Sequence, residues 1–237
     1  MRTLFITRKY PPSVGGMETY SKFVFEALRD LDPGVELLKP RVDIHGRPSL
    51  PQIAGFFLGA CWRLLTQARR YDAVLLGDYA IASLAIIAKL ATWGRIRTVV
   101  SLHGNDLYFM RGHSLTARAY RAISWCVTRS GALDAAVANS HAIRHEATRH
   151  GIAPVTVVPL ATPSAPANVD AGQPRKPQLL FTGRLIAYKG LAWFMASVWP
   201  RLDPRWELLV AGQVWDQSER QAIEGQPRVR YLGAGSR

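Results

Sequence analysis

The most informative segment of the sequence is Gly183-Arg184-Leu185-Ile186-Ala187-Tyr188-Lys189-Gly190. The apolar run before it, 179–181, predicts a buried strand, and the apolar stretch after it, 191–198, predicts a helix. A glycine turn between a strand and a helix presents backbone N–H groups to an anion, and the Arg and Lys add positive charge. The segment therefore predicts an α/β unit that binds a diphosphate through Arg184 and Lys189. Two solvated cations near a helix start are the alternative.

Strands and helices alternate along the rest of the chain. We expect strands at 3–7, 35–38, 73–76, 98–102, 135–138 and 155–158, separated by helices at 17–29, 51–70, 81–92, 114–129 and 140–150. The alternation restarts with strands at 178–182, 206–211 and 228–232 and helices at 190–198 and 216–224. This pattern is typical of doubly wound parallel sheets in an α/β protein.

A proline-rich segment interrupts the alternation between Leu160 and Pro177. Pro, Ala, Ser and Gly make such a segment a stiff connection without regular structure. We therefore expect a Rossmann-like N-terminal domain at 1–160, a linker at 161–177 and a second, partial Rossmann-like domain at 178–237.

Charge and composition restrict the possible partners. The 237 residues carry a net charge of +13, which favours an anionic partner: nucleic acid, a membrane surface or a phosphorylated small molecule. No zinc-finger spacing or RNA-binding aromatic motif is present, which argues against nucleic acid. Cys61 and Cys126 form no CxxC pair and are expected to be small core residues in a reducing compartment. We see neither a secretory leader nor a membrane-spanning stretch, and expect a cytoplasmic protein.

Two loops at predicted strand ends carry candidate ligand contacts. Gly15-Gly16 follows the first strand, where the backbone can approach a phosphate, although a plain tight turn explains the pair as well. His103-Gly104-Asn105-Asp106 follows the strand at 98–102, so His103 is placed to bond a ligand hydroxyl or a developing charge. We expect Asp106 to orient its loop rather than to act as an acid or base.

The next strand end carries Asn139 and Ser140, for which a helix N-cap is the simplest role. The nearby His141 and His145 are four residues apart, but no H-E-x-x-H motif is present. We therefore predict no metal site.

Arg118, Arg121, Trp125 and Arg129 recur at helical spacing within 114–129. This set is either a solvated helix face or a membrane-facing surface, with the arginines toward anionic headgroups.

Taken together, these landmarks resemble the family 4 glycosyltransferases. The matching features occur in family order: 10–18 with its glycine pair, His103-Gly104, 138–140, 155–159, Gly183-Arg184 with Lys189-Gly190, and 206–212. The resemblance implies a GT-B fold of two Rossmann-like domains. It also implies sugar transfer from a nucleotide-diphosphate sugar to a lipid-linked or polysaccharide acceptor, with retained anomeric configuration, no cofactor and no metal ion.

The resemblance also implies residue roles. His103 would contact the donor sugar, Arg184 and Lys189 would hold the leaving diphosphate, and the Gly15-Gly16 loop would touch the diphosphate or the acceptor. The acceptor side would include the loops of Asn105, Asp106, Asn139 and Ser140. Apart from the resemblance, the +13 charge, the set at 114–129 and the apolar segment around Phe56, Phe57 and Trp62 predict peripheral attachment to the cytoplasmic face of a membrane. A core helix is the alternative for the apolar segment.

The sequence departs from the family in two places. Leu160-Ala161-Thr162-Pro163 replaces the Asn-Gly turn that usually follows the strand at 155–158, and the sequence ends at Arg237 before a Glu-x7-Glu segment. We therefore expect a truncated enzyme. The rival interpretation is a catalytically inactive remnant, or a module that binds an acceptor or a membrane.

Overall fold

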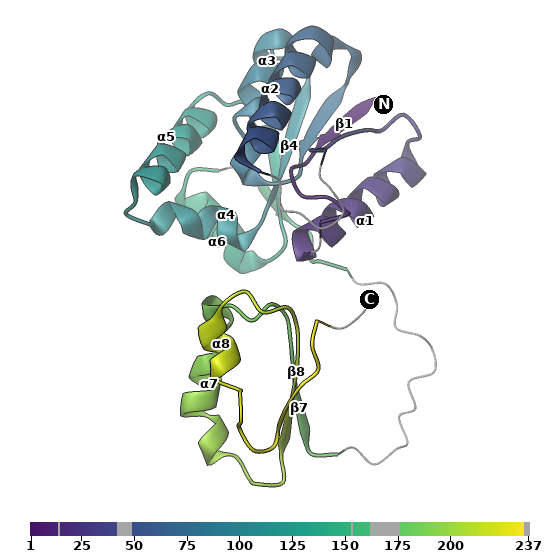
Figure 1. Ribbon diagram of the computed structural model, residues 1–237. Helices are drawn as coiled ribbons and strands as arrows, with labels where there is room; N and C mark the ends of the chain where they lie inside the picture. Colours follow the sequence, from purple (N-terminus) through teal and green to yellow (C-terminus); the bar gives the residue numbers. More distant parts are fainter. Residues whose placement is uncertain (14, 42–48, 153, 162–175, 235–237) are drawn as a thin grey trace. The chain divides into compact units, whose positions relative to one another are not determined.

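The computed structural model describes residues 1–13, 15–41, 49–152, 154–161 and 176–234 (Figure 1). The chain divides into two compact units, Met1–Pro163 and Ser164–Arg237, which we describe separately. The expected linker at 161–177 lies almost wholly outside the described residues. Each unit contains a parallel sheet, and the predicted α/β fold class is confirmed.

The first unit contains a six-stranded parallel sheet in the order β2-β1-β3-β4-β5-β6. Its strands are β1 (Thr3–Ile6), β2 (Glu36–Leu38), β3 (Ala73–Leu76), β4 (Arg97–Leu102), β5 (Ala135–Ala138) and β6 (Val155–Val157). Its helices are α1 (Gly16–Leu31), α2 (Leu50–Gln67), α3 (Leu84–Ala91), α4 (Gly104–Tyr108), α5 (Leu115–Arg129) and α6 (His141–Arg149).

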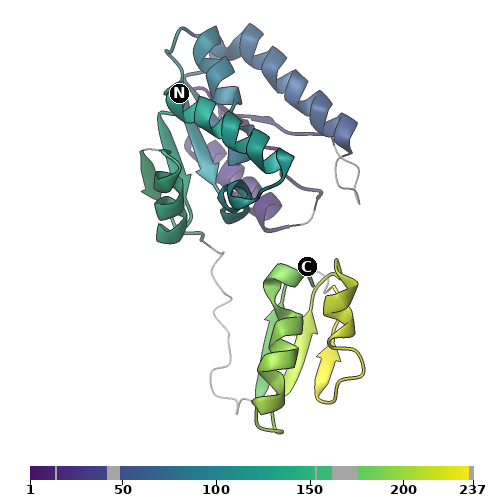
Figure 2. The ribbon, with the colours of Figure 1, turned by 90° about the vertical axis from the view of Figure 1, so that its left-hand side faces the viewer.

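The strand order reverses between β1 and β3. The chain moves from β1 outward to β2 and then returns to β3 on the other side of β1, where Phe5 pairs with Leu37 in β2 and Leu75 in β3. Because crossovers between parallel strands are right-handed, this reversal places α1 on one face of the sheet and α2 and α3 on the other (Figure 2). In open α/β sheets ligands bind at the carboxyl ends of the strands beside such a reversal.

The core of the first unit forms around β1 and α2. Leu4, Phe5 and Ile6 are fully buried because β1 lies between two strands and is covered on both faces. Helix α2 begins at a capping box formed by Ser49 and Gln52, and its residues at four-residue spacing pack on the sheet: Phe56, Ala60 and Leu64. Each large apolar side chain that is fully buried contributes about 1.5–3 kcal/mol.

Three local expectations were wrong. Helix α3 begins at Leu84 rather than at residue 81, because Tyr79–Ile81 form a 3₁₀ turn in which Asp78 accepts a hydrogen bond from Ala80 N. Helix α4 was not predicted, since five residues are too few to show a helical period. Cys126 is exposed on α5 rather than buried in the core, whereas Cys61 is half-buried.

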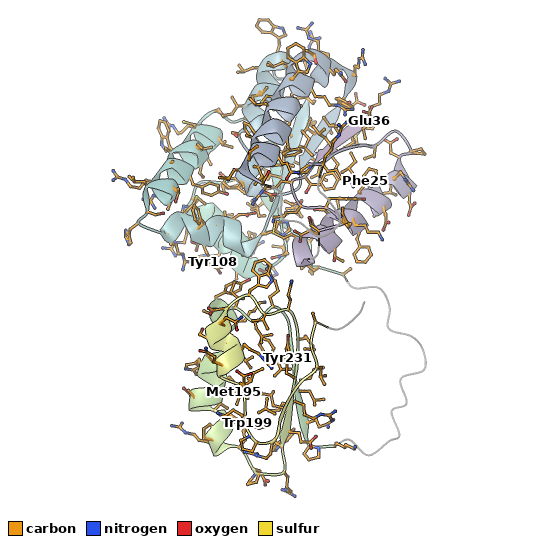
Figure 3. All side chains as sticks on the ribbon, in the orientation of Figure 1. Phe25, Glu36, Tyr108, Met195, Trp199 and Tyr231 are labelled. Atoms are coloured by element: carbon orange, nitrogen blue, oxygen red, sulfur yellow. The ribbon has the colours of Figure 1, made fainter. Side chains whose placement is uncertain are left out.

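The second unit contains a three-stranded parallel sheet in the order β7-β8-β9, with strands β7 (Gln178–Thr182), β8 (Glu207–Ala211) and β9 (Val229–Tyr231). Helices α7 (Leu191–Ser197) and α8 (Gln217–Gln221) lie on one face of this sheet (Figure 1). Met195 and Trp199 point from α7 and the turn after it into the core (Figure 3), beside Leu208 and Val210 of β8.

A close backbone approach joins the ends of β7 and β8. Gly183 N donates to the carbonyl of Ala211 at 3.0 Å, and Leu185 N donates to the carbonyl of Gln213 at 2.9 Å. A Cβ atom added at Gly212 would lie inside the carbonyl group of Gly183. Only glycine fits at position 212, so this residue sets the distance between the two strand-end loops.

We expect Gly212→Ala to destabilise the second unit by roughly 1–3 kcal/mol, because the new methyl group must displace backbone. Denaturant unfolding followed by tryptophan fluorescence measures this change, since Trp199 is buried in the same core. The matched control is Gly59→Ala in α2, where an added Cβ meets nothing within 4 Å. It should be neutral or stabilising by about 0.5–1 kcal/mol. Equal effects of the two substitutions would contradict the close approach.

Candidate functional site

A buried ion pair lies at the strand reversal of the first unit. Arg8 follows β1, and Asp78 lies two residues after β3. The Arg8 Nε atom donates to both carboxylate oxygens of Asp78, at 2.8 and 3.0 Å. The guanidinium also lies 3.8 Å from the carboxylate of Asp106. Burial lowers the pKa of Arg8, but Asp78 and Asp106 outweigh this effect and raise it. The charge of Arg8 is therefore already neutralised by carboxylates of the protein.

Asp106 lies in α4 and connects two loops. Its carboxylate accepts a hydrogen bond from Tyr79 N at 3.2 Å, and its own N–H donates to the carbonyl of His103 at 3.1 Å. Burial, and then the charge of Asp78, raise the pKa of Asp106 to about 7. The same surroundings raise the pKa of Tyr120, whose buried hydroxyl has no hydrogen-bond partner in the described structure.

His103 is buried between α1, β3 and β4. Its Nε2 atom lies 3.1 Å from the carbonyl oxygen of Gly77, and the ring of Tyr20 meets it edge-on at 5.0 Å. The Tyr20 hydroxyl in turn lies 3.2 Å from the Ser101 hydroxyl. Burial lowers the pKa of His103, so the ring is neutral at neutral pH. Because a carbonyl oxygen only accepts hydrogen bonds, Nε2 carries the proton. The Nδ1 atom can therefore accept a hydrogen bond from a ligand hydroxyl.

The Gly15-Gly16 loop forms the start of α1. A Cβ added at Gly15 would lie 2.2 Å from a carboxylate oxygen of Glu18, whereas one added at Gly16 would meet nothing within 4 Å. Lys9 lies 3.6 Å from the same carboxylate. Glu18 therefore occupies the positive end of α1 in this conformation, at the place where an anion was expected.

The loops after β4 and β5 lie together. A Cβ added at Gly104 would be 3.4 Å from Ile143 of α6, and Ser140 caps that helix by accepting from Ile143 N at 3.3 Å. Asn139 is half-buried beside this cap. Asn105 belongs to α4, and its side chain lies outside the described part of the structure.

Arg184 and Lys189 lie in the loop between β7 and α7 of the second unit. Arg184 lies over the ring of Trp215, 4.2 Å from its centroid, and donates to the Tyr188 hydroxyl at 3.4 Å. Lys189 lies 5.7 Å from the centroid of the Tyr188 ring. Within the described residues, neither cation forms an ion pair with a carboxylate. Both charges are therefore available to an anion.

The N-terminus of α7 is already occupied. Glu219 of α8 is buried and accepts a hydrogen bond from Ala192 N at 2.9 Å. The prediction that the N–H groups of this helix end attract the anion is therefore wrong for Ala192 N. Arg184 and Lys189, which precede the helix, remain the predicted anion ligands.

Helix α5 carries the predicted set Arg118, Arg121, Trp125 and Arg129, called the α5 stripe below, and only part of this set is free. Arg121 donates to the carbonyls of Met110 and Gly112 at 2.7 and 2.6 Å, so it fastens the preceding turn. Arg118 is exposed, Trp125 is 64% exposed, and Arg129 lies 6.0 Å from the Trp125 ring centroid.

The described residues contain no group of three or more His, Cys, Asp or Glu side chains arranged to hold a metal ion. Among them, no helix combines the length and apolar character needed to cross a bilayer.

Two parallel α/β units with charged and polar side chains at their strand ends are the architecture expected of a GT-B-type glycosyltransferase. The chain belongs to glycosyltransferase family 4, whose sequence profile matches residues 14–163. No curated protein matches the sequence.

Solved structures show the same fold. The lipopolysaccharide outer core galactosyltransferase WaaB, in its apo form, matches with a TM-score of 0.65 and 19% identity, over 100% of this chain and 69% of its own. Anabaena HepE, in complex with UDP and glucose, matches with a TM-score of 0.64 and 17% identity, over 98% of this chain and 69% of its own. AviGT4, involved in avilamycin A biosynthesis, has a TM-score of 0.51 at 16% identity, over 98% of this chain and 63% of its own.

Sequence reasoning missed three residues around His103: Arg8, Asp78 and Tyr20. Arg8 and Asp78 both follow predicted strands, and this position in the sequence could have indicated that they lie at the site. Their pairing depends on β1 and β3 being neighbours, which the order of elements alone does not state.

The raised pKa of Asp106 predicts a pH dependence of stability. The folded protein holds this proton up to about pH 7, whereas the unfolded chain releases it in the ordinary carboxyl range. Stability from this group is therefore present at low pH and is lost as the pH rises from about 4 through 7. Relative to Asp106→Asn, the wild-type free energy of unfolding should fall by on the order of 1 kcal/mol per pH unit across this window.

Asp134→Asn is the matched control. Partial burial raises the pKa of Asp134, but hydrogen bonds from Lys89 and Thr98 outweigh this effect and lower it. Its stabilising contribution is therefore lost only as the pH falls below the ordinary carboxyl range. Denaturant titrations from pH 4.5 to 7.5 measure the free energy of unfolding of each variant relative to the wild type. This difference should be constant with pH for Asp134→Asn and should change with pH for Asp106→Asn. A difference that does not change with pH for either variant would contradict the raised pKa of Asp106.

Proposed function

We propose that this glycosyltransferase moves a sugar from a nucleotide-diphosphate sugar to a lipid-linked or polysaccharide acceptor. The observation that carries the proposal is that Arg184 and Lys189 follow β7 without carboxylate partners among the described residues. Anabaena HepE, which shares the fold, binds UDP and, in another structure, UDP-glucose. These complexes support a uridine diphosphate sugar as the first donor to test.

The proposed chemistry is retaining and needs no metal ion. Arg184 and Lys189 offset the charge that develops on the departing diphosphate, which is the work a divalent cation does in other enzymes. The Nδ1 atom of His103 accepts a hydrogen bond from a donor-sugar hydroxyl and so fixes the sugar. The acceptor hydroxyl attacks the anomeric carbon, the bond to the diphosphate breaks, and the departing phosphate oxygen takes the acceptor's proton.

The other predicted site residues take supporting roles in this proposal. The Gly15-Gly16 loop contacts the diphosphate through its backbone after the Glu18 carboxylate moves aside. The loops of Asn105, Asp106, Asn139 and Ser140 form the acceptor side. Asp106 acts by holding the His103 loop, through the bond from its N–H to the His103 carbonyl.

A catalytically inactive acceptor- or membrane-binding module is the second candidate. The exposed Arg118 and Trp125 of α5 favour a surface that binds an acceptor or a membrane. Incubation of the protein with UDP-sugars and a lipid-linked acceptor separates the two candidates. Product formation supports the enzyme, and binding without product over long incubation supports the module.

If turnover is observed, His103→Ala and Arg184→Ala should each lower kcat/KM by roughly 10²-fold or more, as expected for the loss of one group that stabilises the transition state. The matched controls are His113→Ala and Arg205→Ala, which remove exposed side chains of the same types. An unchanged rate in a site variant removes that residue from the proposed site. NMR of the product's anomeric proton tests retention, and activity in excess EDTA tests metal independence.

We also propose reversible attachment to an anionic membrane surface through the α5 stripe. Each exposed arginine near such a surface contributes about 1 kcal/mol, so Arg118→Gln with Arg129→Gln should weaken vesicle binding roughly 30-fold at low salt. Arg121 is left intact because it bonds to backbone carbonyls. Arg201→Gln with Arg230→Gln is the charge-matched control. Sedimentation with phosphatidylglycerol vesicles measures binding, and equal binding of both double variants would make the stripe a solvated face.

A further inference from the structure

We infer that Trp215 is a positioning residue for Arg184: its indole ring holds the guanidinium group over its face, so that the N–H edge stays available to the donor diphosphate. This inference rests on the proposed function, because it takes Arg184 as a diphosphate ligand. Trp215 comes from the loop after β8, about 30 residues away from Arg184 in the sequence. Nothing in the sequence motif around Arg184 indicates it.

The geometry is that of a stacked cation and ring. The Arg184 Cζ atom lies 4.2 Å from the Trp215 ring centroid. A guanidinium group in such a stack presents one face to the ring, whereas its five N–H groups point outward in its own plane. One of them reaches the Tyr188 hydroxyl at 3.4 Å, which is a long contact. The stack therefore restricts the orientation of Arg184 without using most of its donors.

The ring itself is fixed to the loop that carries Arg184. Trp215 N donates to the carbonyl of Leu185 at 3.0 Å, and Leu185 N donates to the carbonyl of Gln213 at 2.9 Å. The indole Nε1 donates to the Gln213 side chain at 3.1 Å. Leu185 is fully buried. Stacking partner and cation are thus held by one short ladder between the two strand-end loops.

Two other stacked arginines of the second unit show why Arg184 differs. Arg220 lies over the Tyr231 ring at 4.3 Å, but it also pairs with Glu224 at 3.8 Å. Arg228 lies over Trp199 at 4.6 Å, but its NH1 group donates to two backbone carbonyls. Arg184 has neither a carboxylate nor a carbonyl acceptor among the described residues. Its charge and its donors are oriented and unused, which suits a diphosphate.

The test measures binding of UDP, inorganic pyrophosphate and uridine to the full chain by calorimetry. Trp215→Leu keeps an apolar side chain but removes the π face, and should weaken UDP and pyrophosphate binding roughly five- to tenfold. Uridine binding and the unfolding midpoint should not change. Trp215→Phe, which restores a ring, should recover most of the affinity. Trp193→Leu is the matched control, because Trp193 is 66% exposed on α7.

A second measurement needs no ligand. The Arg184 Hδ protons should show an upfield ring-current shift in the NMR spectrum of the wild-type protein, and Trp215→Leu should abolish it. Absence of this shift overturns the inference.

Different results would contradict the phosphate role of Arg184 and the positioning role of Trp215. If Arg184→Ala weakens UDP binding and Trp215→Leu does not, the proposed phosphate role of Arg184 survives and the positioning role is wrong. If Arg184→Ala binds UDP and pyrophosphate as the wild type does, or the wild type binds neither at millimolar concentration, the phosphate role fails and the positioning role with it.

Discussion

The carboxylate of Asp78 is fully buried at the carboxyl end of β3, and a buried charge without a partner costs several kcal/mol. Arg8, at the end of the neighbouring β1, supplies the partner with two short hydrogen bonds. Asp78 also caps the turn that follows β3 through Ala80 N. One charge pair therefore fixes the ends of two adjacent strands. The Asp106 carboxylate accepts from Tyr79 N of the same turn, and Asp106 N donates to the His103 carbonyl, so the position of His103 depends on the same pair.

In the second unit the ends of adjacent strands are held together without an ion pair. Its strand-end loops meet through backbone, with Gly212 against the Gly183 carbonyl and Leu185 bonded to the loop after β8. No ion pair is needed to hold these loops, so Arg184 is not consumed as a structural partner. Its aromatic neighbour Trp215 restricts it by stacking. The difference in construction explains why comparable basic residues at strand ends are paired in one unit and unpaired in the other.

Local signals predicted most of the fold, because strands and helices of this type reveal themselves by apolar periodicity within ten to twenty residues. Strands β3, β5 and β7 begin and end where the sequence predicted. What was missed depends on distant or very short features. The Arg8–Asp78 pair spans 70 residues, and α4 has five residues. Arg121 has the spacing of a surface stripe, but it donates hydrogen bonds to the carbonyls of Met110 and Gly112. These carbonyls belong to a turn, and apolar periodicity does not predict such a turn.

Pairing of the cations, rather than their number, decides where an anion binds. A net charge of +13 marks the whole chain as basic, yet Arg8 is neutralised by Asp78, and Lys9 lies beside Glu18. A diphosphate approaching the Gly15-Gly16 loop must first displace the Glu18 carboxylate from the start of α1. At Arg184 and Lys189, no carboxylate of the described residues has to be displaced. Under the proposed function, this difference makes the second unit the main source of diphosphate affinity, and leaves the first unit with a neutral histidine suited to a sugar hydroxyl.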